Sequence, residues 1–137
     1  MILMAALVLI GINLPAYADE RPVDYERLPK QAREFISQHF QSWEVMGVTQ
    51  DDGEYDVFFN NGNKIEFDRK GNWKEIECKT GFIPYAVVPS AIANFVKGNY
   101  PGRDIIEAKR ERKGHQVKLD NRVELKFDRN DRFIGLD

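Results

Sequence analysis

The chain has 137 residues and one cysteine, Cys78, which excludes an intrachain disulfide. We interpret this cysteine as a small apolar residue on an inward-facing strand position. The formal net charge of −2 hides an asymmetry, because residues 19–84 carry 9 basic and 14 acidic side chains whereas residues 85–137 carry 11 basic and 8 acidic ones.

The first 18 residues have the pattern of a signal peptide. They contain no charge, carry an apolar run from Ile2 to Ile12, and end in Ala16-Tyr17-Ala18, a small-x-small pattern that signal peptidase recognises. We therefore expect cleavage before Asp19, a periplasmic or secreted location, and no membrane span after signal removal. The remaining chain is long enough for one compact domain, which we place at residues 28–137.

Residues 19–27 are polar, and we interpret them as a flexible leader that precedes the domain after signal removal. A helix of about three turns is predicted to follow from Pro29, because a first helical turn tolerates a residue without an N–H. The apolar positions then recur at helical spacing on one face. These positions are Ala32, Phe35, Ile36, His39 and Phe40.

After this helix the apolar period changes to two, which indicates strands. The predicted strands are Trp43–Gln50, Tyr55–Asn60, a strand containing Ile65 and Phe67, and Trp73–Cys78. Asn60-Asn61-Gly62 and Asp68-Arg69-Lys70-Gly71 supply residues that suit tight turns.

The second half repeats the first, since residues 28–76 recur without a gap as residues 88–136, at an offset of 60. A second helix is predicted from Pro89, and strands near 103–110, 114–119, 122–127 and 132–136. Arg122 takes the place of Gly62 and Asp131 that of Gly71, which leaves the types of these two turns open. The repeat units are residues 28–84 and 85–137.

Each unit is thus a helix followed by a four-stranded antiparallel meander. We predict an α+β fold in which the two units form an eight-stranded antiparallel sheet with both helices on one face. The inward set that meets the helices is Val57, Phe59, Ile65, Phe67, Val117, Leu119, Leu125 and Phe127. The opposite face is predicted to be polar and open to water.

These motifs resemble the PepSY-like family, also described as β-lactamase-inhibitor-like, over about Leu28 to Leu136. The residues that carry the resemblance are Phe67-Asp68, Gly71, Trp73, Ile83-Pro84, Val88-Pro89, Phe127-Asp128 and Phe133. The resemblance implies a secreted or periplasmic bacterial protein with tandem units, similar in architecture to β-lactamase inhibitor proteins, which lay a concave sheet over an enzyme. No inhibitory residue of those proteins can be matched to a position of this chain.

The sequence offers little that points to catalysis. Asp51, Asp52, Glu54 and Asp56 could form a weak cation site, but no twelve-residue calcium loop is present and we favour a solvated turn. His39 and His115 are interpreted as residues at the edge of the core, and no serine lies in a nucleophile elbow. We therefore predict no enzyme, no metal site and no cofactor.

Binding to another protein of the cell envelope, with inhibition as one form of it, is the predicted function. Phe58 and Trp73 are expected to form an exposed aromatic pair among charged side chains, which is typical of an interface hot spot; coverage by the leader or by the linker near Phe82 is the alternative. The candidate interface residues are Phe58, Trp73, Asp56, Lys64, Glu66, Lys118, Lys126 and Tyr85.

Two other functions stay open: a small-ligand or peptide carrier with an apolar pocket between the repeat units, and a hydrolase with a convergent set of titratable groups. The basic run Lys109-Arg110-Glu111-Arg112-Lys113 is interpreted as a solvated hairpin tip, and we expect no nucleic-acid partner. The pattern does not determine the oligomeric state.

Overall fold

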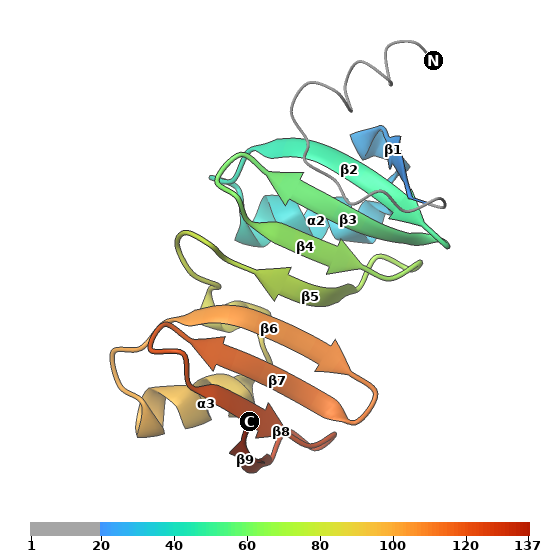
Figure 1. The fold of residues 1–137 in the computed structure, drawn as a ribbon. Helices are drawn as coiled ribbons and strands as arrows, with labels where there is room; N and C mark the ends of the chain where they lie inside the picture. Colours follow the sequence, from blue (N-terminus) through green and yellow to red (C-terminus); the bar gives the residue numbers. More distant parts are fainter. Residues whose placement is uncertain (1–19) are drawn as a thin grey trace. The chain divides into compact units, whose positions relative to one another are not determined.

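The structure is a computed structural model that describes residues 20–137 (Figure 1). The predicted signal peptide, residues 1–18, lies outside the described residues. The chain divides into two compact units, of which the first ends at Trp73 and the second runs from Lys74 to Asp137.

Within residues 20–137, two α-helices and a nine-stranded antiparallel sheet confirm the predicted α+β class, with one strand more than the eight predicted. The additional strand is β1 (Arg21–Val23), which lies in the segment predicted to be a flexible leader. It pairs antiparallel with the next strand of the chain, Pro22 opposite Thr49. Three residues are too few to show an apolar period of two. Pro22 also argues against a strand in the sequence, although an edge strand tolerates proline.

The first unit contains the 3₁₀ helix η1 (Tyr25–Arg27), the helix α2 (Lys30–His39) and the strands β2 (Val45–Asp51), β3 (Glu54–Phe59) and β4 (Lys64–Phe67). Pro29 occupies the N-cap position of α2. Ala32 and Ile36 are buried, and the ring of Phe35 lies 5.9 Å from that of Phe67, edge to face. The apolar stripe of α2 therefore packs against one side of these strands, as Figure 1 shows.

The second unit begins with most of β5 (Trp73–Glu77) and continues with η2 (Tyr85–Val87), α3 (Ser90–Asn99), β6 (Ile105–Glu111), β7 (Gly114–Leu119), β8 (Glu124–Phe127) and β9 (Phe133–Leu136). β5 pairs antiparallel with β6, Ile76 opposite Ala108. Ile92 and Val96 of α3 are fully buried, and the ring of Phe95 lies 5.5 Å from that of Phe127. The helix of this unit thus also packs on one side of its strands.

The predicted inward positions form the cores of the two units. All eight have at most 2% of their surface exposed: Val57, Phe59, Ile65, Phe67, Val117, Leu119, Leu125 and Phe127. Burial of one such side chain contributes about 1.5–3 kcal/mol. The period of two therefore identified correctly which sides of β3, β4, β7 and β8 face a helix.

Two turns that lack their glycine in the second repeat still adopt the conformation of the first. Arg122 has φ 73° where Gly62 has 88°, and Asp131 has φ 63° where Gly71 has 94°. The hydrogen bonds repeat as well, since the N–H of Gly62 donates to Phe59 O and that of Arg122 to Leu119 O. The left-handed conformation costs a residue with a Cβ about 1–2 kcal/mol. Pairing of the adjacent strands must therefore stabilise these two turns against that cost.

Candidate functional site

Four of the predicted interface residues lie on the face of the first unit that α2 does not cover. Asp56 and Phe58 point to this side from β3, and their cross-strand partners on β4 are Glu66 and Lys64 respectively. All four side chains are partly exposed. On its other side, Phe58 lies opposite Gly47 of β2, a residue without a side chain that could cover the ring.

The prediction that Trp73 is an exposed partner of Phe58 is wrong, because Trp73 is only 4% exposed. Its strand does not alternate regularly: Trp73 and Ile76 are both buried, with Lys74 and Glu75 partly exposed between them. The matching strand of the second repeat, β9, contains a register shift at the same place. One extra residue of this kind puts the side chains before and after it on the same side of the sheet, so Trp73 faces the same side as Ile76 and not the side that strict alternation predicts.

Tyr85 does not lie on a sheet face. It belongs to η2, its hydroxyl donates a hydrogen bond to the carbonyl of Arg103 at 2.5 Å, and the Lys97 ammonium of α3 lies 5.0 Å from the ring centre. These contacts hold Tyr85 beside the helix, and it does not join the predicted interface.

Lys118 and Lys126 lie on the open face of the second unit, where both form ion pairs. Lys118 Nζ is 3.5 Å from a carboxylate oxygen of Glu107 and 3.7 Å from one of Glu124, and Lys126 Nζ is 3.1 Å from Asp137. Cations and anions therefore alternate on this face, which balances its charge.

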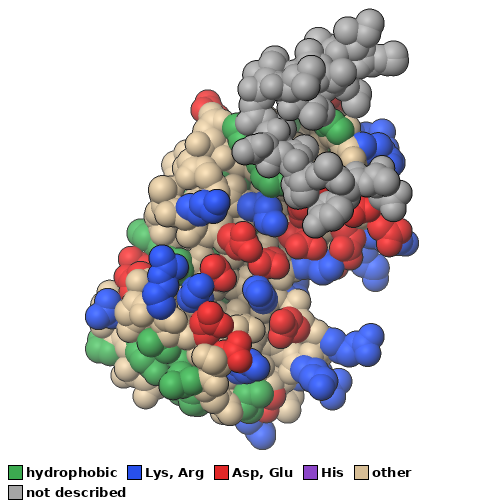
Figure 2. Space-filling view, viewed as in Figure 1, with side chains coloured by type: hydrophobic (Ala, Val, Ile, Leu, Met, Phe, Trp, Pro, Cys, Tyr) green, Lys and Arg blue, Asp and Glu red, His purple; other side chains and the backbone are tan. Residues whose placement is uncertain are grey.

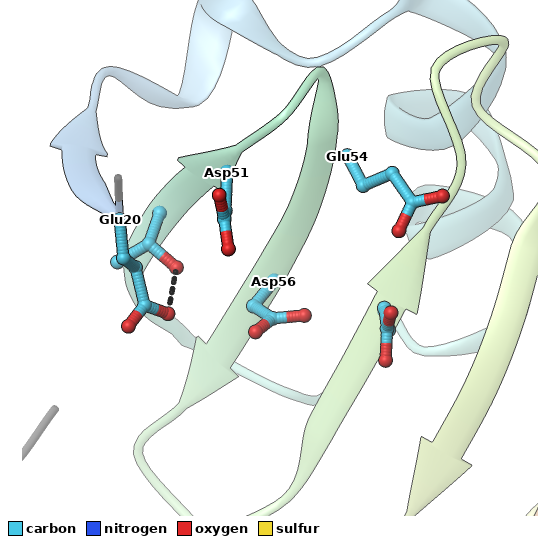
Figure 3. A pocket seen from close by; sticks show the side chains of 6 residues that line it. Glu20, Asp51, Glu54 and Asp56 are labelled. Carbon is cyan, nitrogen blue, oxygen red and sulfur yellow. Dashed lines mark hydrogen bonds between the residues drawn. The ribbon is translucent and has the colours of Figure 1, made fainter. Parts of the chain in front are cut away.

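The same face of the first unit carries a carboxylate cluster around a pocket of about 130 Å³ (Figures 2 and 3). We call this the carboxylate pocket. Its lining residues are Glu20, Thr49, Asp51, Glu54, Asp56 and Glu66. Asp51 lies directly opposite Glu54, and Asp56 directly opposite Glu66, so like charges meet across both strand pairs. Like charges directly opposite one another destabilise a sheet, so the carboxylates of this pocket oppose the pairing of these strands.

Burial and charge act together on Asp56. Burial, the largest effect, raises the pKa of Asp56 from 3.8 to about 6; Lys64 opposes the rise, whereas the neighbouring carboxylates, led by Glu66, add to it. In the same pocket the hydroxyl of the buried Thr49 donates a hydrogen bond to a carboxylate oxygen of Glu20 at 3.2 Å (Figure 3). Ionisation of Asp56 is consequently less favourable in this pocket than that of a carboxyl group in water.

The carboxylates are spread around the pocket as they stand (Figure 3). Within residues 20–137 no three His, Cys, Asp or Glu side chains are arranged so that they could hold a metal ion without moving. Asp52, which belongs to the same acidic run of the sequence, does not line the pocket. It lies at the tip of the β2–β3 hairpin, where its Oδ1 is 3.4 Å from Nη2 of Arg69. The strands β1 and β4 bring Glu20 and Glu66 to the pocket in its place.

Glu20 is the lining residue that sequence reasoning missed. It precedes β1, the strand that had no recognisable pattern, and therefore had no predicted position. Glu66, in contrast, could be placed opposite Asp56 from the length of the β3–β4 hairpin alone.

Cys78 is buried, as predicted, with 8% of its surface exposed. Burial, with a smaller contribution from Glu107, raises the pKa of its thiol to about 12. Because the thiolate is the reactive form, this cysteine is inert at neutral pH and serves as an apolar residue.

The fold and the polar open faces define a class, that of α+β proteins built from tandem helix-and-meander units. A family model described as "Putative beta-lactamase-inhibitor-like, PepSY-like" matches residues 53–135. The chain belongs to this PepSY-like family, as its motifs predicted. A comparison with curated proteins finds no match.

Three solved structures are similar to the chain over most of both lengths. The first, from Bacteroides thetaiotaomicron and titled "putative calcium-regulated periplasmic protein", is 41% identical with a TM-score of 0.82 and covers 87% of this chain and 97% of its own. Two periplasmic proteins from Bacteroides vulgatus are 38% and 35% identical, with TM-scores of 0.84 and 0.79. They cover 89% and 86% of this chain, and 99% and 98% of their own.

These relatives confirm the predicted periplasmic location. A search of residues 20–137 for helices long and apolar enough to cross a membrane finds none.

Proposed function

We propose that the protein is a non-catalytic binding protein that binds another protein of the cell envelope through the open sheet face and hairpin loops of its first unit. The observation that carries this proposal is Phe58, a partly exposed aromatic ring on a rigid sheet, flanked by Lys64 and, on the same strand, Asp56. Aromatic residues with a charged surround are enriched at binding hot spots.

Two further observations support a binding role. The family description names an inhibitor-like class, and an inhibitor acts by binding its enzyme. The pockets described within each unit are lined mainly by charged and polar side chains, whereas a carrier of small apolar ligands needs an apolar pocket. Protein binding is therefore preferred to the carrier role.

The test is capture of partners from envelope extract with the processed protein as bait, followed by affinity measurement for the captured protein. We expect Phe58→Ala to weaken binding by about 2 kcal/mol, roughly thirtyfold, because the ring supplies most of the apolar contact area. Lys64→Glu should weaken binding through reversed charge beside the ring.

Phe82→Ala is the matched control, since Phe82 is an aromatic residue that is 53% exposed in the second unit. It should leave capture unchanged. Equal capture by the wild-type and Phe58→Ala proteins, with both folded, would remove the proposed surface.

A second candidate function is calcium binding in the carboxylate pocket. Five carboxylates and the Thr49 hydroxyl supply only oxygen atoms, the ligands that calcium takes in sets of six to eight. The 41% identical relative is titled calcium-regulated, which supports the choice of this ion. Because the carboxylates do not meet as they stand, binding requires Asp56 and its neighbours to rotate inward.

We expect calcium to raise the stability of the protein by about 2.7 kcal/mol at a concentration one hundred times the dissociation constant. Asp56→Asn should reduce calcium affinity at least tenfold. Isothermal titration calorimetry and thermal unfolding with and without calcium measure both effects, and Glu124→Gln, on the face of the second unit, is the control that should bind calcium normally.

The stability of the folded protein without calcium is expected to fall as the pH rises, because of Asp56. The pKa of Asp56 in the folded protein, about 6, lies above its ordinary value of 3.8, so the folded state holds this proton more tightly than the unfolded state. The resulting stabilisation is complete below about pH 4 and is lost as the pH rises through 6. Without calcium, Asp56→Asn should therefore be more stable than wild type at neutral pH but not at pH 4. An unchanged melting temperature on addition of calcium contradicts this candidate function.

A further inference from the structure

One end of the second unit gathers exposed cations from two segments that are distant in the sequence. Arg110, Arg112 and Lys113 are exposed on the β6–β7 hairpin, and Arg129 and Arg132 are exposed on the turn between β8 and β9. We call these five residues the basic end. Figure 2 shows Lys and Arg side chains projecting from the side of this unit on which the β6–β7 hairpin lies in Figure 1.

The strand pairing joins the hairpin and the turn into one surface. His115, just after the hairpin tip, lies opposite Phe127, the last residue of β8. Gly114 is packed so closely that a Cβ there would lie 1.9 Å from Phe127 O and 2.8 Å from the carbonyl carbon of Asp128. The hairpin tip therefore rests on the start of the β8–β9 turn.

Three acidic side chains lie among these cations, and two of them have local roles. A carboxylate oxygen of Asp128 accepts hydrogen bonds from the backbone N–H groups of Asn130 and Arg132, at 2.8 and 3.0 Å. Asp131 lies 3.7 Å from His115 Nδ1. Glu111 is the exposed acidic residue of the hairpin itself. Five cations and three carboxylates leave this end with an excess of two positive charges.

The first repeat does not share this feature. Its corresponding hairpin carries Asp51 and Asp52, and Arg69, the counterpart of Arg129, binds Asp52 through both its backbone carbonyl and its carboxylate. Charge at this end thus changes sign between the repeats, although the fold is the same.

An exposed apolar strip begins at the same end. β9 starts directly after the turn, and its residues Phe133, Ile134 and Leu136 are 38%, 63% and 63% exposed. In the first repeat the residue that corresponds to Leu136 is Ile76, which is fully buried opposite Ala108 of β6. Isolated exposed apolar residues are common, but here three of them adjoin a basic cluster.

We propose that this end of the second unit binds the anionic phospholipid surface of a membrane, with the basic end on the headgroup phosphates and Ile134 and Leu136 in the interfacial layer. Cations beside exposed apolar side chains are the combination that holds peripheral proteins at anionic bilayers, with each Lys or Arg contributing about 1 kcal/mol. A soluble polyanion would use the cations alone and would leave the apolar strip in water. The proposal is independent of partner or calcium binding by the first unit.

The test is co-sedimentation of the processed protein, from Asp19 onward, with vesicles of phosphatidylglycerol and phosphatidylcholine in equal parts, and with vesicles of phosphatidylcholine alone. We expect binding to the mixed vesicles only, weakened by added salt because the cations are exposed. Arg112→Glu/Lys113→Glu should reduce the partition coefficient by about tenfold or more. Ile134→Ser/Leu136→Ser should reduce it several-fold without altering its salt dependence.

Lys30→Glu/Lys70→Glu is the matched control, because it reverses two exposed cations of the first unit. It should bind vesicles as wild type does, and circular dichroism should show every variant folded. An equal loss in this control would mean that only overall charge matters and would overturn the proposal. Binding to heparin without binding to vesicles would overturn it in favour of a soluble polyanion.

Discussion

Gly114→Ala is expected to destabilise the protein by about 3 kcal/mol or more. Gly114 has φ 146°, a conformation that residues with a Cβ rarely adopt. The added Cβ would lie 1.9 Å from the backbone oxygen of Phe127 and within 2.9 Å of two backbone atoms of Asp128. Backbone atoms cannot rotate away as a flexible side chain can, so β7 must separate from β8 to make room.

Urea unfolding of the two proteins measures this effect. Gly98→Ala is the control, because Gly98 lies within α3 and a Cβ there would meet no atom within 4 Å. That variant should be more stable than wild type by roughly 0.5–1 kcal/mol, since alanine favours a helix. If Gly114→Ala unfolded at the urea concentration of wild type, the close packing of the hairpin on the turn would be refuted.

Phe67→Ala should cost about 3–5 kcal/mol, because it removes a large ring from a fully buried position. The ring of Phe67 contacts that of Phe35 on α2, so its loss leaves a cavity between the helix and the strands. The repeat supplies an internal comparison. Phe127→Ala removes the equivalent ring, which contacts Phe95 and Phe133, and should cost a similar amount.

Phe82→Ala is the control for both, since Phe82 is 53% exposed and its loss should change stability by less than about 0.5 kcal/mol. The midpoints and slopes of urea unfolding give the comparison. A cost below 1 kcal/mol at Phe67 would mean that α2 can move onto the strands and fill the cavity.

The two proposed roles of the first unit share residues but not readouts. Phe58→Ala removes a ring and keeps every carboxylate, whereas Asp56→Asn removes one charge and keeps the ring. If both variants lose partner capture, and added calcium restores capture in neither, the carboxylate pocket is part of the interface. Loss in Phe58→Ala alone would separate protein binding from calcium binding.

Much of the candidate site could be predicted from local pattern. The period of two placed Asp56, Phe58, Lys64 and Glu66 together on the open face, because short hairpins fix the register between β3 and β4. The same reasoning failed for Trp73, since one extra residue in its strand reverses the orientation of the side chain and has no signature in composition.

The repeat itself was a partial guide. Asp68 and Asp128 occupy equivalent positions, and both carboxylates accept backbone N–H bonds from residues two and four positions later. The repeat could not predict the need for Gly114, whose counterpart is Glu54, because the two hairpins place their glycines at different positions.

By itself, the sequence determined the α+β class, the helices, eight of the nine strands and the core, because apolar period and turn residues are local properties of the chain. Tertiary structure alone decided that Glu20 joins the carboxylate pocket, that Trp73 is buried, and that cations of the β6–β7 hairpin meet those of the β8–β9 turn. These outcomes depend on which segments lie side by side, and such contacts are set by strand pairing between distant residues, which no local pattern records.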